Sequence, residues 1–141
     1  MTIQIIETSQ APDAKPVAVS KRLTTTFTEL ITVPSYEVPE QSFGGGTVIV
    51  PGIAEIISPL LVSNFTASSS LISIRLFRIE SNTAFFIAND LPIAANDVTP
   101  IPLNGQFILS GDVLEVKSSD VDSLDVTLSY TLGQAEQDDV I

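Results

Sequence analysis

The chain has 141 residues, which suits one domain with a core of its own, and it contains no cysteine, histidine or tryptophan. The missing cysteine and histidine exclude disulfide bonds, thiol chemistry and the nucleophilic triads that use these residues, and they remove the usual ligands of zinc. The formal net charge is −11, from 17 acidic and 6 basic residues, and such a surface repels nucleic acids and anionic membranes. The same charge keeps a protein soluble, and it also suits docking on a basic protein surface.

An N-terminal strand and an extended arm are expected over residues 1–22. Residues 2–8 (TIQIIET) suit a short first strand, whereas residues 9–20 contain two prolines, several alanines and few bulky side chains. This composition predicts an extended arm that is neither helix nor packed core. Residues 23–33 (LTTTFTELITV) are rich in β-branched residues and predict a strand with one buried face.

A loop is expected over residues 34–46, because this stretch contains two prolines and three consecutive glycines. Two strand-like segments follow, at residues 47–50 and 53–65. Pro59 lacks the backbone N–H that a central strand position requires, so it is expected to split the second segment. The sequence TASS at residues 66–69 then predicts a turn.

The most regular strand patterns lie in the second half of the chain. Residues 70–80 place aliphatic side chains at alternate positions, which predicts a strand with one face in the core. The expected core face comprises Ile72, Ile74 and Leu76. Serine and asparagine at positions 81–82 predict a two-residue hairpin turn, and residues 83–88 predict the return strand.

Residues 89–104 are rich in proline, asparagine and aspartate, so an extended crossover is expected there. Short strands are expected at residues 107–109 and 113–117. Residues 124–132 (LDVTLSYTL) alternate apolar and polar side chains more regularly than any other segment, which predicts another strand. The polar, acidic residues 133–141 are expected to form a C-terminal tail.

Together these elements predict an all-β fold. No helix of ordinary length is supported, and the strands recur about every eight to twelve residues, a spacing typical of a sandwich or jelly roll. We therefore expect an antiparallel β-sandwich, jelly-roll-like, over residues 23–132. The extended N-terminal arm and the short C-terminal tail flank this domain.

The one enzyme class that the residue types still allow is a two-carboxylate glycosidase. Its candidate carboxylates are Glu29, Glu55, Glu80, Asp90, Asp112 and Glu115. Sugar-binding clefts normally need aromatic platforms, and most aromatic residues of this chain fall on strands where core packing explains them. The pair Gly111–Asp112 is interpreted first as a turn, with the aspartate bonding to backbone nitrogens. We expect no enzymatic activity and no cofactor.

Three acidic residues, Asp120, Asp122 and Asp125, lie close together in the sequence and present the carboxylate oxygens that Ca²⁺ prefers. Their spacing lacks the glycine and the terminal glutamate of an EF-hand loop. A solvated acidic loop is therefore the favoured interpretation, with a Ca²⁺ site as the alternative.

Phe85 and Phe86 are adjacent on one predicted strand, so their rings lie on opposite faces of it. Two arrangements accommodate such a pair. Either one ring faces a neighbouring subunit, or both faces of the strand are covered within the domain.

Three motifs carry a resemblance to small β-rich structural proteins of tailed bacteriophages: ANDLPI at residues 88–93, PLNGQFILSGDVLEV at residues 102–116 and LDVTLSY at residues 124–130. In virion proteins of this kind, a D-x-P-I turn leads to L-x-G, an apolar strand, G-D-x-L-x-V and a final V-x-L-S-Y strand. The order and spacing here are similar over residues 72–130, which is under half of the chain. The resemblance implies a virion component, and it does not distinguish capsid decoration from a neck, tail or baseplate position.

The expected function is that of a non-enzymatic phage virion structural protein. A capsid decoration (cement) protein is favoured, which would form a symmetric homo-oligomer such as a trimer and bridge subunits of the major capsid protein. Its expected partners are its own copies and other virion proteins, with no nucleic acid and no membrane, and its expected location is the virion. The alternatives are a neck, tail or baseplate protein and a carbohydrate-binding or adhesin module.

Overall fold

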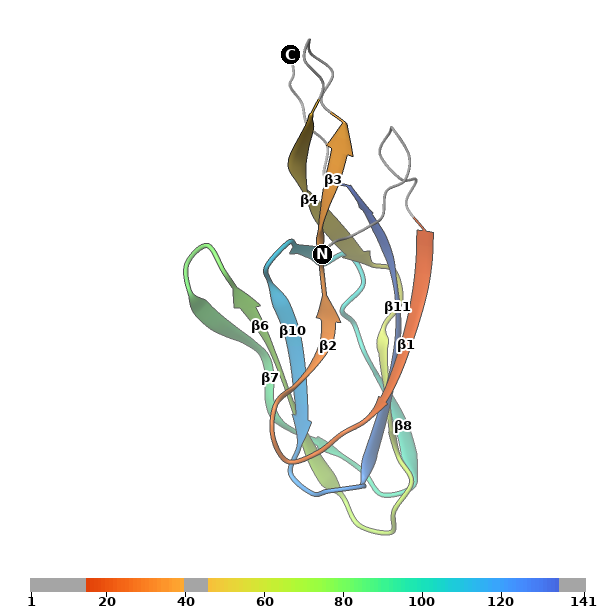
Figure 1. Cartoon of the computed structure of the whole chain (residues 1–141). Helices are drawn as coiled ribbons and strands as arrows, with labels where there is room; N and C mark the ends of the chain where they lie inside the picture. Colours follow the sequence, from red (N-terminus) through yellow and green to blue (C-terminus); the bar gives the residue numbers. More distant parts are fainter. Residues whose placement is uncertain (1–14, 40–45, 135–141) are drawn as a thin grey trace.

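A computed structural model describes residues 15–39 and 46–134, and this part of the chain is folded almost entirely into strands (Figure 1). No α-helix occurs within these residues, so none of them forms a helix long and apolar enough to cross a membrane. The strands, in chain order, are β1 (Lys15–Arg22), β2 (Thr28–Thr32), β3 (Ser35–Pro39), β4 (Thr47–Ile56), β5 (Leu60–Asn64), β6 (Ser70–Arg78), β7 (Thr83–Ile93), β8 (Asp97–Ile101), β9 (Phe107–Leu109), β10 (Val113–Ser118) and β11 (Leu124–Gln134).

The strands form two antiparallel sheets that enclose one core, which confirms the predicted all-β sandwich. The smaller sheet has the strand order β2-β10-β6-β7. The larger sheet has seven strands in the order β3-β4-β11-β5-β8, with β1 added to β11 and β9 added to β4. Two hairpins extend beyond the body in Figure 1, β3–β4 at the top and β6–β7 at the left.

Strand β11 is the centre of the larger sheet. Along one edge it pairs with the whole of β1, from Lys15 opposite Leu132 to Arg22 opposite Asp125. Along its other edge it pairs first with β5 and then with β4. The alternation predicted for this segment is confirmed over residues 124–128, where Leu124, Val126 and Leu128 are buried. Further along the strand, Tyr130 and Leu132 are only partly buried against the core.

The core face predicted for β6 is also confirmed. Ile72 and Ile74 are fully buried, and Leu76 is 5% exposed. Facing them from the larger sheet are buried aliphatic residues such as Leu60 and Val62 on β5. Both sheets therefore contribute side chains to the same layer of buried aliphatic residues, and this burial is the main source of stability.

The expected N-terminal arm is in part a strand. Residues 15–22 pair with β11 as β1, although residues 9–20 carry two prolines and little apolar bulk. Pro16 is tolerated because β1 is an edge strand of the described sheet, pairing there with β11 alone. The predicted strand at residues 2–8 and the first part of the arm lie outside the described residues.

The strand expected at residues 23–33 is shorter than predicted, since β2 begins at Thr28. The pairing register between β2 and β10 shifts by one residue beside Glu115. This bulge puts Leu30 and Ile31 in the core together, at 5% and 1% exposure. A strict alternation could not have predicted that two consecutive side chains would both be buried.

The loop expected at residues 34–46 contains a strand. Residues 35–39 form β3, which pairs with the first half of β4, and residues 40–45 lie outside the described part. Strand β4 continues through Pro51 to Ile56, and beyond Pro51 it exchanges β3 for β11 and β9 as its partners. The predicted break at Pro59 is confirmed, because β4 ends before this residue, at Ile56, and β5 begins after it, at Leu60.

The crossover expected at residues 89–104 is mostly strand. Strand β7 continues to Ile93 with two irregularities in its pairing with β6, and β8 follows at Asp97–Ile101. The left-handed conformation of Asp90, with φ of 55°, accompanies one of these bulges. The turn before β7 spans four residues, from Ile79 to Asn82, instead of two. The C-terminal strand extends to Gln134, and residues 135–141 of the expected tail lie outside the described part.

Gly52 lies where strand β4 passes close to Pro34, in the connection between β2 and β3. Its N–H donates to the carbonyl oxygen of Pro34 over 3.0 Å, and a Cβ added to Gly52 would lie only 2.3 Å from that oxygen. We expect Gly52→Ala to lower the free energy of unfolding by about 1–3 kcal/mol, because backbone must move to make room. Chemical denaturation measures this, with the exposed Thr47→Ala on the same strand as a control that changes stability by less than about 0.5 kcal/mol. Equal stability of the two variants would contradict the close approach.

Two tyrosines are expected to lower the free energy of unfolding at alkaline pH. Burial raises the pKa of Tyr36 above its ordinary value of 10.0, and the neighbouring Tyr130 raises it further. Burial also raises the pKa of Tyr130. Because the unfolded chain releases these protons first, the stability they contribute is complete below pH 10 and is lost as the pH rises above it.

The free energy of unfolding is therefore expected to fall as the pH rises above about 10, and denaturation curves recorded over this alkaline range measure it. The double variant Tyr36→Phe/Tyr130→Phe removes both phenols and should flatten this dependence. Identical slopes for the double variant and the original chain would show that the phenols do not contribute.

Candidate functional site

Asp112 is the most deeply buried of the candidate carboxylates, at 2% exposure, and all its contacts are structural. One carboxylate oxygen accepts a hydrogen bond from the backbone N–H of Ile79 over 2.9 Å. The other accepts from the guanidinium of Arg78 over 2.7 Å and from the N–H of Leu109 over 3.3 Å. The interpretation of Gly111–Asp112 as a turn whose aspartate binds backbone nitrogens is confirmed, with Gly111 at a φ of 91°.

Glu29 and Glu115 are opposite each other in the register of β2 and β10. Each already has a partner: Glu115 accepts from the Nε of Arg75 over 2.6 Å, and Glu29 accepts from the hydroxyl of Thr32 over 2.8 Å. Arg75 also stacks on the ring of Phe27, with its guanidinium carbon 3.8 Å from the ring centroid. These ion-pair, hydrogen-bond and cation–π contacts are typical of the outer surface of a sheet, where they stabilise neighbouring strands.

The three remaining glycosidase candidates are dispersed. Glu55 is on β4 in the larger sheet, Glu80 is in the turn before β7, and Asp90 is on β7 itself. One surface groove, between β1 and β11, contains the carboxylate of Asp125, which is paired with Arg22. Another, beside the β6–β7 hairpin, contains Glu80 and Asp112, and Asp112 is paired with Arg78. Neither groove therefore holds two unpaired carboxylates that could flank a sugar bond.

The acidic loop residues have different partners. Asp120 accepts from the hydroxyls of Ser70 and Ser119, and Asp125 is paired with Arg22. Asp122 has a left-handed backbone with φ of 55°, as a turn requires. Within residues 15–39 and 46–134, no group of three or more acidic side chains is placed to hold a metal ion.

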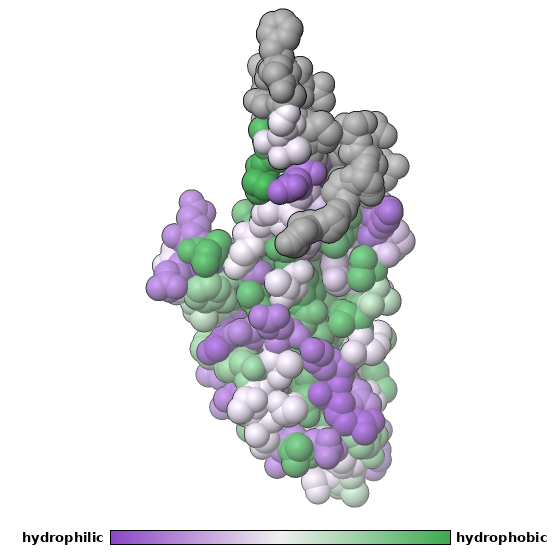
Figure 2. Space-filling model, in the orientation of Figure 1, coloured by the Kyte–Doolittle hydropathy of each residue, from purple (hydrophilic) through white to green (hydrophobic). Residues whose placement is uncertain are grey.

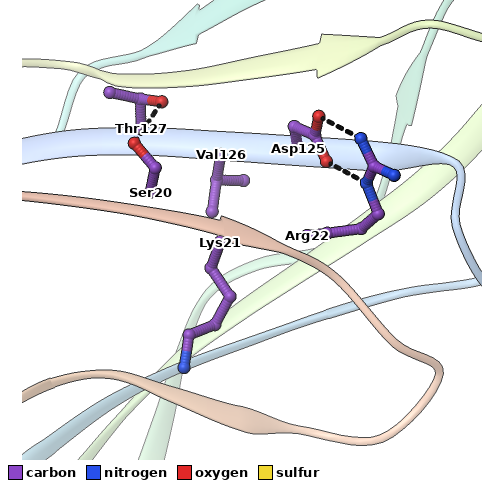
Figure 3. A pocket seen from close by; sticks show the side chains of 6 residues that line it. All are labelled: Ser20, Lys21, Arg22, Asp125, Val126 and Thr127. Carbon is purple, nitrogen blue, oxygen red and sulfur yellow. Dashed lines mark hydrogen bonds and ion pairs between the residues drawn. The ribbon is translucent and has the colours of Figure 1, made fainter.

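A groove of about 380 Å³ lies where the end of β1 meets β11 (Figure 3). Arg22 and Asp125 form a two-point ion pair across it, with Nε–Oδ1 at 2.8 Å and Nη2–Oδ2 at 3.1 Å. The hydrogen bond to Asp125 holds the pKa of Arg22 above its ordinary value. The guanidinium also lies over the ring of Phe65, 4.6 Å from its centroid. Because the two charged groups neutralise each other, we interpret this ion pair as a structural link between β1 and β11.

The feature with the strongest functional signal is exposed apolar surface on the two projecting hairpins. On β3–β4, Val48 and Ile49 are 38% and 63% exposed. The β6–β7 hairpin and strand β7 carry more such residues, and Figure 2 shows hydrophobic surface beside the hydrophilic tip of this hairpin. The exposed large apolar residues of this region are Ile79, Phe85, Phe86, Ile87 and Leu91.

A second groove, of about 550 Å³, lies beside the same hairpin and connects it with β9 and β4. Its apolar lining comes from Pro51, Ile79, Phe107 and Leu109. The Arg78–Asp112 pair lies at this groove with its charges already neutralised by each other. Contiguous apolar surface of this kind is typical of protein–protein contact sites. We therefore regard the hairpin β6–β7 and this groove as the candidate interaction surface.

The adjacent phenylalanines gave the one sequence signal for this surface. Phe85 and Phe86 are 52% and 53% exposed, so the arrangement in which both faces of the strand are covered within the domain is wrong. The contributions of Ile79, Phe107 and Leu109 were not predictable, because they depend on how the hairpin lies against β9.

A scan against models of known protein families finds none that matches this chain, and a search of curated proteins finds no similar sequence. The likeness to phage virion proteins rests on the three sequence motifs alone.

Proposed function

We propose that this protein is a non-enzymatic structural component of a tailed phage virion, and that it acts as a capsid decoration protein bridging neighbouring capsid subunits. The motifs at residues 88–93, 102–116 and 124–130 suggest the virion context. The observation that carries a structural role is the exposed apolar surface on the projecting hairpins β3–β4 and β6–β7.

The charged side chains support the same proposal. All three ion pairs among the described residues join strands or turns that are far apart in sequence, such as Arg75 with Glu115 and Arg78 with Asp112. Such pairs hold a β-framework in a fixed shape. A rigid sandwich with exposed apolar hairpins is suited to binding neighbouring protein subunits, because rigid elements lose little conformational entropy when they dock.

The acidic surface favours a basic docking site on the partner. With a net charge of −11, the chain is attracted to basic protein surfaces at low ionic strength, and that attraction weakens with added salt. Capsid binding is therefore expected to be salt-sensitive in rate, while the apolar hairpin contacts maintain the bound state.

The test uses purified protein, capsids that lack it and two variants with the same added charge. Ile49 on the β3–β4 hairpin and Val121 in the loop before β11 are both 63% exposed. Ile49→Asp is expected to weaken capsid binding at least about tenfold, because it puts a charge into an apolar contact, whereas Val121→Asp should leave binding unchanged. The absence of the protein from virions in mass spectrometry, together with no binding to capsids, would reject the proposal.

The number of copies per particle separates capsid decoration from the neck, tail and baseplate positions. A decoration protein follows the capsid lattice, so a cryo-electron microscopy map should show it repeated over the head surface. Density restricted to the tail axis would instead place it in the neck, tail or baseplate.

A further inference from the structure

Strand β7 is an edge of the smaller sheet with an unusual composition. It pairs with β6 on one side, and no strand among residues 15–39 and 46–134 pairs with its other side. A free strand edge presents unpaired N–H and C=O groups to which another strand can add, and proteins normally protect such edges with charges, proline, bulges or short length.

The other edge strands in the described part of the chain are protected in these ways. Strand β1 carries Lys15, Pro16, Lys21 and Arg22. Strands β2 and β3 have five residues each and contain a glutamate, and β8 is equally short and contains both an aspartate and a proline. Strand β9 has only three residues.

Strand β7 is protected mainly in its second half. There the pairing with β6 shifts between Ile72 and Ile74, and Asp90 and Pro92 interrupt the apolar sequence. The other shift leaves Ile87, at the end of the first half, without a partner on β6. The first half, residues 83–87 (TAFFI), has no charge and no proline. It is also highly exposed, with Phe85 at 52%, Phe86 at 53% and Ile87 at 38%.

Both faces of this first half are open. Phe86 is opposite Arg75 on the outer face of the sheet, and Phe85 is opposite the buried Leu76 on the core-facing side. Within the described residues, Phe86 packs against one other aromatic ring, Phe27, with centroids 6.1 Å apart. A strand added beside β7 would cover the exposed sides of both rings, which a contact on one face alone would not do.

The charge of the smaller sheet favours a second copy of the chain as the occupant. Its four strands contain three acidic residues (Glu29, Asp90 and Glu115) and three basic residues (Arg75, Arg78 and Lys117), so their net charge is zero. In a chain with a net charge of −11, this sheet is a region where two copies meet with little repulsion. A basic partner would gain no attraction from a neutral edge.

We propose that two copies of the chain pair through residues 83–87 of β7, antiparallel and about a two-fold axis, which joins two four-stranded sheets into one of eight strands. An uncharged apolar edge is complementary to itself, and closed two-fold dimers are the commonest homo-oligomers. The pairing satisfies the free backbone groups of β7 and buries four phenylalanine rings in each dimer. This arrangement is a dimer, whereas a trimer was the example of a symmetric oligomer expected from the sequence. The pairing does not depend on the virion role.

Cysteine cross-linking tests the contact directly, because the chain has no cysteine of its own. In a two-fold antiparallel pair, one residue lies opposite its own copy with Cα atoms roughly 4.5–5.5 Å apart, within reach of a disulfide. Single variants Ala84→Cys, Phe85→Cys and Phe86→Cys are made in the full chain and oxidised. Phe65→Cys and Phe107→Cys are the controls, since these rings are similarly exposed at 45% and 49% on other strands or loops.

We expect a covalent dimer at one or more β7 positions, formed at least about tenfold faster than in either control. A second measurement uses Phe86→Asp, which places two like charges across the axis and is expected to convert a concentration-dependent dimer into a monomer in sedimentation equilibrium. Equal cross-linking at all positions, or a purified chain that remains monomeric at every concentration, would overturn the proposal. The second result would leave a heterologous strand as the occupant of this edge.

Discussion

Replacing Asp112 with alanine is expected to lower the free energy of unfolding by about 3–5 kcal/mol, measured by denaturant titration. The carboxylate is almost fully buried and accepts hydrogen bonds from the Arg78 guanidinium and from the N–H groups of Ile79 and Leu109. Its removal leaves a positive charge without its partner and two backbone donors without acceptors. Because the Arg78 side chain is 32% exposed and water can solvate part of it, the lower end of this range is expected.

Two further variants separate the charge from the hydrogen bonds. Asp112→Asn keeps an acceptor oxygen for a backbone N–H and removes the negative charge, so a smaller loss than for alanine is expected. Arg78→Ala removes the cation, and in a double-mutant cycle with Asp112→Ala the two losses should add to more than the loss in the double variant. Strict additivity would mean that the two side chains do not interact.

Asp112 also illustrates what a sequence reveals of such a site. The turn at Gly111–Asp112 is encoded locally, since glycine accepts a positive φ and aspartate binds nearby backbone nitrogens, and both features were predicted. The ion pair with Arg78 depends on a residue 34 positions earlier, which the fold brings alongside. The same holds for Arg75 with Glu115, 40 positions apart, so neither pair was predictable.

The strands were predictable where burial on one side imposes a period of two. Ile72 and Ile74 on β6 and Val126 on β11 were assigned correctly for this reason. The predictions failed where proline was taken to exclude a strand, at Pro16 and Pro92. Both residues lie on edge strands, and a sequence alone does not reveal which strands are edges.

The candidate interaction surface was only partly predictable for a related reason. Exposure of Phe85 and Phe86 follows from the position of β7 at the end of the sheet, and strand order is a property of the whole fold. The sequence did indicate that two adjacent rings need cover on both faces of one strand. What it could not show is that the domain itself leaves both rings half exposed.

Ile74→Ala is expected to lower the free energy of unfolding by about 3–4 kcal/mol, because it opens a cavity in the shared core. Ile74 is fully buried on β6, between Val116 of β10 and Ala88 of β7 in the sheet register. Its neighbours are held by strand pairing on both sides, so they cannot move inward to fill the space without breaking backbone hydrogen bonds.

The series Ile74→Val and Ile74→Ala tests this account, since valine removes one methyl group and should cost about 1 kcal/mol. Ile57→Ala is the matched control: the same substitution is made where the side chain is 47% exposed, and it should cost less than about 1 kcal/mol. Similar losses for Ile57→Ala and Ile74→Ala would mean that Ile74 is not in a tightly packed core. A loss of about 3–4 kcal/mol confined to Ile74 would instead place this side chain in the tightly packed core between the two sheets.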